Sequence, residues 1–164
     1  FLYHERDKYH RALELVQERW GISDYQSQEY FFDLTDYYDS EMGKPVFRII
    51  NSYSTLIDPG GLAEIKLATN EIEELLSGSG KRRVNLDPGY IDYDKMVLAS
   101  AKYNYQKVYL SDGIYADITL FYRKGRYVAA EWAFPDFKQG IYENDLLQIR
   151  HLYKMQLKAI MDKP

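Results

Sequence analysis

Apolar residues recur with helical spacing in two segments of the first half of the chain. From Tyr9 to Trp20 they repeat every three or four positions and Gly21 follows as a stop signal, which predicts a helix over residues 7–20. Residues 62–76 show the same spacing more clearly, after an Asp-Pro-Gly-Gly turn. The first half therefore contains two predicted helices, each with one apolar side.

Alternating apolar and polar positions predict the strands around these helices. They cover residues 28–34, 46–53 and 82–86, where aromatic and β-branched residues are frequent. The resulting order is helix, strand, strand, helix, strand. With one more strand, largely before Phe1, this order becomes βαββαβ, the split ferredoxin-like arrangement. We expect the three strands to share one antiparallel-rich sheet, with both helices on the same face.

The second half of the chain is predicted to extend the same domain. Its expected elements are a helix over residues 92–102, a three-strand β segment over residues 106–110, 114–122 and 126–133, and a long C-terminal helix over residues 141–161. No Pro/Ser-rich or charged linker divides the chain. We therefore expect a single α+β domain over residues 1–164.

Composition narrows the classes of function. The 164 residues include no cysteine, which excludes disulfide scaffolds, thiol nucleophiles and cysteine-ligated zinc. The three histidines are scattered, which argues against a histidine-rich metal site. No apolar run approaches the ~18 residues of a membrane span, and no secretory signal pattern opens the chain. We expect a soluble, cytoplasmic protein without a membrane partner. Its 17 tyrosines fit packing at the faces and rims of a sheet.

The charge distribution argues against nucleic-acid binding. The net charge is −4, with 15 acidic and 7 basic residues in positions 1–80 and 10 acidic and 14 basic residues in positions 81–164. The isoelectric point is about 5.4, whereas nucleic-acid-binding domains usually carry a dense basic stripe and a high isoelectric point. We do not expect a nucleic-acid partner, and the oligomeric state stays open.

The segment Gly78-Ser79-Gly80-Lys81 looks like part of a phosphate-binding loop, but its surroundings do not fit one. Such a loop needs a glycine five positions before the Gly-Lys pair and a Ser or Thr after the lysine. Leu75 and Arg82 stand at those positions. The segment also follows a helix and precedes a strand, which is the reverse of the order in a phosphate loop. It is predicted to be a helix-to-strand connector.

The acidic residues at the end of the first predicted strand and in the loop after it form no recognisable metal site. Asp33, Asp36, Asp39 and Glu41 lack the alternating ligand spacing and the central glycine of a calcium loop. Acidic loop residues are usually solvated or cap backbone donors. We assign no metal to the chain and leave its cofactor unknown.

The strongest cluster of polar groups lies at residues 82–90, where a short strand runs into an Asp-Pro-Gly turn. Strand alternation places three of its polar side chains on one face, and arginine is suited to phosphate or carboxylate. These groups fit a small anionic or polar ligand. The candidate ligand-binding residues are Arg83, Asn85, Asp87 and Tyr90, with Lys66 and Asn70 of the second helix and Asp36 and Tyr37 of the strand–strand loop.

Two interpretations of this cluster stay open, and neither names a catalytic residue. In the first, the protein binds a small ligand or is an enzyme whose reaction the sequence does not name. In the second, the strand face is polar surface, and the protein is a structural or partner-binding module that uses its tyrosine-rich sheet and terminal helix. A pocket that contains Arg83 and Asp87 favours the first, and a flat exposed apolar patch favours the second.

Four separated motifs carry a resemblance to a known family. They are Thr35-Asp36-Tyr37-Tyr38 with Glu41-Met42-Gly43, then the segments 62–70, 84–90 and 113–120. Through them the chain resembles an uncharacterised prokaryotic domain-of-unknown-function family, some members of which carry an automatic "GTP-binding protein" label. The resemblance implies an apolar first strand and no catalytic residue. Because the chain lacks a phosphate loop and an N/T-K-x-D motif, we expect no GTP binding of the phosphate-loop kind.

Overall fold

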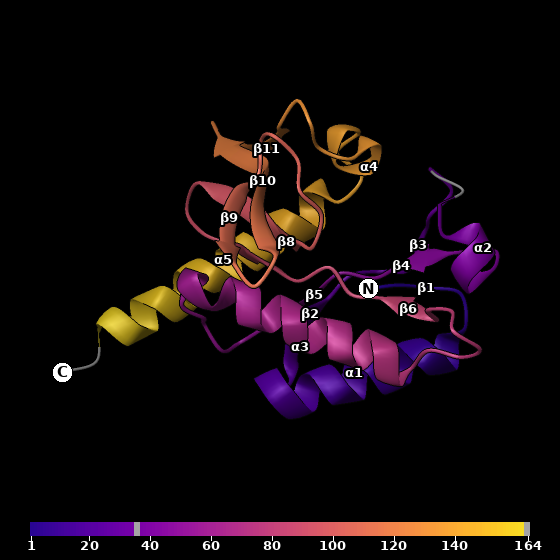
Figure 1. Ribbon diagram of the computed structural model, residues 1–164. Helices are drawn as coiled ribbons and strands as arrows, with labels where there is room; N and C mark the ends of the chain where they lie inside the picture. The colour runs from indigo at the N-terminus through magenta and orange to yellow at the C-terminus, as the bar shows by residue number, and fades with distance from the viewer. Residues whose placement is uncertain (35–36, 163–164) are drawn as a thin grey trace. The chain divides into compact units, whose positions relative to one another are not determined.

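The computed structural model describes residues 1–34 and 37–162 and has an α+β fold with antiparallel sheets (Figure 1). In chain order its elements are β1 (Leu2–Tyr3), α1 (Arg6–Trp20), β2 (Ser23–Gln26), β3 (Tyr30–Phe31), α2 (Asp39–Met42), β4 (Phe47–Arg48), β5 (Asn51–Tyr53), the 3-10 turn Pro59–Gly61, α3 (Leu62–Leu75), β6 (Val84–Asn85), β7 (Gly89–Ile91), β8 (Lys95–Ser100), β9 (Val108–Ser111), β10 (Ile114–Arg123), β11 (Arg126–Ala129), α4 (Pro135–Lys138) and α5 (Glu143–Met161). The strands pair in the orders β3-β4-β1-β6, β11-β10-β8-β7 with β9 on β10, and β2-β5.

The described chain divides into two compact units. The first comprises Phe1–Thr55 and Leu67–Asp87, and the second comprises Leu56–Lys66 and the chain from Pro88 onward. The chain passes from one unit to the other after Thr55, after Lys66 inside α3, and after Asp87. The expectation of a single domain over residues 1–164 stays a prediction.

In the first unit, two helices share one core with the central strands. Tyr3 of β1 and Val84 of β6 lie opposite each other in register. Both belong to a buried cluster that also contains Ala12 of α1 and Ile72 of α3. α1 and residues 67–75 of α3 therefore pack on the same face of these strands, as Figure 1 shows. The apolar periodicity placed both helices to within one residue at each end, because it reports the face that this core buries.

The strands of the first unit are shorter and more divided than the alternation predicted. A strand expected largely before Phe1 is present as β1, within the sequence. The predicted strand 28–34 is reduced to β3, and the predicted strand 46–53 is two strands, β4 and β5. They separate because β4 pairs with β1 and β3, whereas β5 pairs with β2. β2 was not predicted, since its sequence Ser-Asp-Tyr-Gln lacks an apolar alternation.

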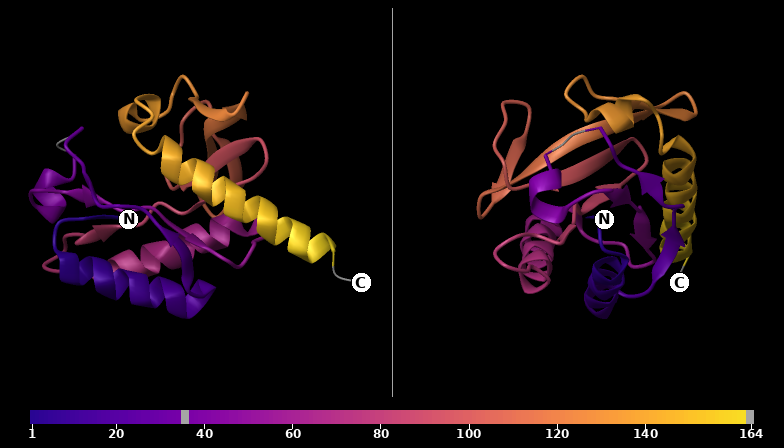
Figure 2. Two further views of the ribbon diagram at one scale, coloured as in Figure 1. Left: turned by 180° about the vertical axis from the view of Figure 1, so that it is seen from behind. Right: turned by 90° about the vertical axis from the view of Figure 1, so that its right-hand side faces the viewer.

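The second unit is built on the five-stranded sheet. β10 pairs with β8 along one side and with β9 and β11 along the other. Leu62 and Ala63, at the start of α3, pack with Val97, Ala99 and Ile114 in a buried cluster. α5 contacts β7 and β11, at opposite ends of the strand order, so it crosses the sheet, as the left view of Figure 2 shows.

The predicted helix over residues 92–102 is wrong, because this segment is a turn followed by β8. Asp92 Oδ1 accepts hydrogen bonds from the backbone N–H groups of Asp94 and Lys95, at 2.8 and 2.9 Å. An aspartate that caps a helix and one that closes a turn use the same acceptor, so the local signal is ambiguous. Pairing with β7 and β10 makes the following apolar run a strand, which the short run alone does not reveal.

The remaining calls in the second half differ less from the structure. The predicted terminal helix is α5, which begins two residues later than expected and ends where expected. The three predicted strands are β9, β10 and β11, within the larger sheet.

Within residues 1–34 and 37–162, no helix has both the length and the apolar character needed to cross a membrane.

Candidate functional site

Three connections meet at one end of the first sheet. β1 pairs antiparallel with β4 and with β6, and Tyr3 lies opposite both Phe47 and Val84. The residues that follow Tyr3 therefore lie at the same end of the sheet as those that precede Phe47 and Val84. The segments brought to this end are residues 4–5, 41–43 and 81–83.

A tight turn delivers the third of these segments. Gly78 and Lys81 exchange both backbone hydrogen bonds, N to O, at 2.9 and 3.0 Å. Between them Ser79 and Gly80 both have positive φ, 52° and 72°, as a type I′ turn requires at its two central positions. The segment is thus a helix-to-strand connector, as predicted. Because β6 begins only at Val84, residues 82 and 83 lie outside the strand and do not follow its alternation.

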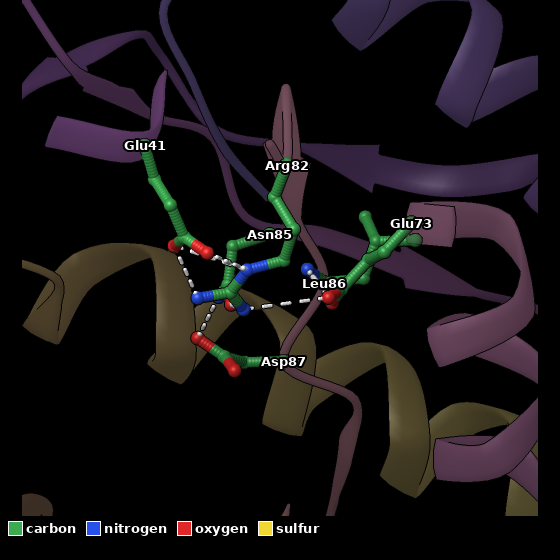
Figure 3. Close-up of polar contacts among 6 residues, drawn as sticks. All are labelled: Glu41, Glu73, Arg82, Asn85, Leu86 and Asp87. Atoms are coloured by element: carbon green, nitrogen blue, oxygen red, sulfur yellow. Dashed lines mark hydrogen bonds and ion pairs between the residues drawn. The ribbon is translucent and has the colours of Figure 1, made fainter. Parts of the chain in front are cut away.

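Arg82 lies at the centre of a polar network (Figure 3). Its Nε donates to both carboxylate oxygens of Glu41, at 3.2 and 3.1 Å, and its Nη2 donates to Glu41 Oε2 at 2.6 Å. Its Nη1 donates to Asn85 Oδ1 at 2.8 Å and to Glu73 Oε2 at 3.4 Å. The hydrogen bonds to Glu41 raise the pKa of the Arg82 guanidinium, against the lowering effect of its burial. The Arg82 side chain therefore stays protonated and positively charged.

Glu73 and Asn85 are the buried members of this network, 5% and 4% exposed. Glu73 Oε1 also accepts a hydrogen bond from the backbone N–H of Leu86 at 2.7 Å, and Asn85 Nδ2 donates to Asp87 Oδ2 at 2.8 Å. A carboxylate without partners is strongly disfavoured in an interior. The Arg82 guanidinium and the Leu86 N–H therefore stabilise Glu73 inside the first unit.

A pocket of about 360 Å³ lies beside the network. It is lined by His4, Glu5, Glu41, Met42, Gly43, Lys81 and Arg83. Arg83 Nη1 donates to Glu5 Oε1 at 3.2 Å. Glu5 is the N-cap of α1 but makes no side-chain capping bond in the described structure, so its carboxylate serves the pocket wall and not the helix end.

His4 is held on the pocket wall by two neighbours. Its Nδ1 lies 2.8 Å from the carbonyl oxygen of Pro45, which can only accept, so Nδ1 carries the proton. Its ring lies against Gly43, where a Cβ would come within 3.2 Å of His4 Cδ2. Gly43 also has a φ of +94°, in the region that favours glycine. A glycine at this position therefore allows both the positive φ and the close approach of the imidazole.

Comparison with known families assigns the chain to a family whose activity is not described. A family model described as "Domain of unknown function (DUF4416)" matches residues 1–153. The chain belongs to this family. No curated protein and no solved structure matches the chain. No named relative supports a GTP-binding label, and function must be argued from the site itself.

Among the predicted ligand-binding residues, Asn85 and Asp87 contact each other, whereas Arg83 pairs with a different residue. Asn85 and Asp87 share a hydrogen bond, whereas Arg83 pairs with Glu5. The prediction put Arg83 on the face of Asn85 by strand alternation. In the structure Arg82 reaches Asn85 instead, because the strand begins after both arginines.

The other predicted residues differ in burial and in the unit to which they belong. Asn70 is half-buried on α3, and Tyr37 is 51% exposed. Lys66 and Tyr90 belong to the second unit, where Lys66 is buried and Tyr90 packs against the cluster that contains Leu62. Asp36 lies outside the described residues.

The sequence did not predict the roles of Arg82, Glu41, Glu73 and His4. A signal for one pair was present, since Glu73 and Arg82 flank a helix end and a two-residue turn with opposite charge. Glu41 stands in the Glu-Met-Gly motif of the family resemblance. His4 had no local signal, because its place depends on the pairing of β1 with β4 and β6. Among the described residues, no group of three or more His, Asp or Glu side chains is arranged to hold a metal.

Proposed function

We propose that the protein binds a small anionic or polar metabolite in the pocket at the end of the first sheet. The observation that carries this proposal is the lining, where His4, two carboxylates, a lysine and an arginine converge on a space of about 360 Å³. That volume is near the lower end of the range for small-molecule sites. Charged side chains of both signs on one wall favour a polar ligand.

Arg83 is the residue we expect to contact an anionic group of the ligand. A guanidinium has five N–H donors in a planar fork, and the ion pair with Glu5 uses the Nη1 group. Lys81 adds a second cation from the same segment. Asn85 and Asp87, which the sequence predicted as ligand contacts, support this site indirectly, since Asn85 accepts from the guanidinium that binds Glu41.

The other predicted contacts stay proposals. The sequence predicts a ligand site along the strand and turn of residues 82–90, and five of its residues are not needed for binding in the pocket. These are Lys66, Asn70, Asp36, Tyr37 and Tyr90. A variant at any of these positions that weakened ligand binding would extend the site beyond the pocket lining.

We also propose that the first unit has the split βαββαβ topology expected from the sequence. The elements β1, α1, β3, β4, α3 and β6 follow that order along the chain, with β2 and β5 as an added pair. The antiparallel neighbours β3-β4-β1-β6 support it. In this topology the pocket segments are the connections at one end of the sheet.

The alternative, a partner-binding module, depends on the exposed aromatic residues of the second unit. Tyr103, Tyr105 and Tyr109 are 73%, 81% and 59% exposed. Nothing in the described structure shows what covers them. The pocket is therefore the better supported basis for a function.

A ligand screen with one matched pair of variants tests the pocket proposal. Thermal shift is measured with inorganic phosphate, small carboxylic acids, sugar phosphates and amino acids, because a ligand that binds the native state raises the melting temperature. Arg83→Gln should weaken binding of any hit about tenfold or more, since it removes a charged donor. Arg19→Gln is the control, because Arg19 also makes an exposed ion pair, with Glu71, away from the pocket.

Both variants should keep nearly the stability of the wild-type protein. The Arg19 pair is exposed, and the side chains of Arg83 and Glu5 are still 31% and 38% exposed, and such surface pairs contribute ~1 kcal/mol or less. The proposal fails if no compound in the screen binds. It also fails if Arg83→Gln binds the hit as tightly as Arg19→Gln does. Unfolding of Arg83→Gln would show that the residue serves the fold.

A further inference from the structure

The pocket wall presents hydrogen-bond acceptors and donors in separate sets. The acceptors are the carboxylates of Glu5 and Glu41, and the donors are the cationic groups of Lys81 and Arg83. Two acids face two bases, so the charged lining is balanced. A pocket built for a multiply charged anion would instead carry an excess of cations around the space, without carboxylates on its wall.

His4 adds a third acceptor. Its Nδ1–H donates to the Pro45 carbonyl, so in the neutral ring Nε2 holds a lone pair. Nε2 makes no hydrogen bond within the described part of the chain, and the ring lines the pocket beside Gly43. An acceptor nitrogen and two carboxylates match the three N–H donors of one ammonium group.

From this complementarity we infer that the pocket takes a zwitterionic ligand of the amino-acid class. The inference rests on the pocket function proposed above and adds the ligand class. The ammonium group binds on the side of Glu5, Glu41 and His4, and the carboxylate binds to Arg83. Lys81 stands beside the carboxylate, and the buried side chain of Met42 gives the wall an apolar element.

A phosphate ligand fits the same wall less well. Its negative charge would gain from Arg83 and Lys81 but would face two carboxylates in a small space. Arg82 does not line the pocket, but its ion pair with Glu41 weakens the repulsion from that carboxylate, so discrimination against phosphate depends mainly on Glu5. The repulsion between like charges in a partly desolvated pocket is larger than in water. The sign of the effect of removing Glu5 therefore separates the two ligand classes.

The experiment compares an amino acid with analogues that each lack one of its charged groups. The standard amino acids are screened by thermal shift, and the best is titrated by NMR next to its deaminated acid, its decarboxylated amine and inorganic phosphate. We expect the amino acid to bind at least tenfold more tightly than any of the three. The backbone amide signals of Gly43 and Arg83 should shift during its titration.

Glu5→Gln is the decisive variant. It should weaken binding of the amino acid about tenfold, because the ammonium group loses a partner. It should strengthen binding of the deaminated acid, because a repulsive charge is removed. Glu14→Gln is the control, since Glu14 lies on the same helix in an exposed pair with Arg11. Gly43→Ala should also weaken binding, since its Cβ would displace the His4 ring.

Three results are distinguishable. Selective binding of the amino acid together with the predicted effect of Glu5→Gln supports the inference. If phosphate or the deaminated acid binds as tightly as the amino acid and Glu5→Gln strengthens it, the ligand class is wrong while the pocket function stands. If no probe shifts the pocket amides, both the ligand class and the pocket function are wrong.

Discussion

Replacing Arg82 by methionine removes the guanidinium and keeps the length of the side chain. The side chain of Glu41 is 35% exposed and regains water, whereas the side chain of Glu73 is only 7% exposed and does not. Glu73 would keep the Leu86 N–H but lose its arginine, and buried Asn85 would lose a charged donor. Loss of one partner from a buried pair destabilises by about 3–5 kcal/mol and from an exposed pair by about 1 kcal/mol or less. For this half-buried network we expect about 2–4 kcal/mol.

The assay needs a probe for the first unit alone, and the two tryptophans provide one. Trp20 packs against the core of the first unit, and Trp132 belongs to the second. In a Trp132→Phe background, urea titration followed by fluorescence reports the first unit. Arg19→Met is the control, with an expected loss below ~1 kcal/mol.

A double-mutant cycle with Glu73→Gln isolates the interaction between Arg82 and Glu73, and contacting residues usually give a coupling of about 0.5–3 kcal/mol. The reasoning is refuted if Arg82→Met and Arg19→Met lose the same free energy of unfolding. It is also refuted if the cycle shows no coupling between Arg82 and Glu73.

Two further predictions concern stability. A Cβ on Gly89 would lie 2.3 Å from the backbone oxygen of Val97, so Gly89→Ala should destabilise the second unit by about 1–3 kcal/mol in thermal unfolding, whereas Gly61→Ala, with nothing within 4 Å, should not. Burial and then the Asp87 carboxylate raise the pKa of Tyr38 to about 12. The folded state therefore holds this proton more tightly than the unfolded state, and stability is lost as pH rises from about 10 to 12. Tyr38→Phe should reduce this loss in urea titrations across that range, and an unchanged slope would contradict the assignment.

Helices were predictable from the sequence where apolar residues recur at helical spacing over a long segment. α1 supplies Tyr9, Ala12 and Val16 to one buried cluster at three- and four-residue spacing, so its period locates it. α3 supplies Leu62 and Ala63 to one cluster and Ile72 to another. Strands of two to four residues carry too few positions for alternation to be seen. β4 and β5 are adjacent in sequence but belong to different sheets, and only their distant partners decide where one ends and the other begins.

The candidate site failed to follow from the sequence for a related reason. Asn85 and Asp87 were identified because polar residues in and after a strand are noticeable, but their partner depends on where β6 begins. If the strand began one residue earlier or later, Arg82 and Arg83 would exchange places between the two faces of the strand. His4 and Glu41 are 37 positions apart along the chain, and both line one pocket. Its lining depends on strand pairing that no local pattern encodes.

The two consecutive arginines have different surroundings. From this difference we expect Arg82 to stabilise the fold and Arg83 to contact the ligand. Arg82 makes hydrogen bonds to Glu41, Glu73 and Asn85, so moving it would disturb several partners at once. Arg83 makes one ion pair, with Glu5, beside the pocket. A ligand carboxylate can replace or share that single partner at little conformational cost, whereas it cannot compete for Arg82. Loss of Arg82 should therefore appear in unfolding free energy, and loss of Arg83 in ligand affinity. If each variant instead changed both quantities equally, the network and the pocket would be one structural unit and not a scaffold with a binding residue beside it.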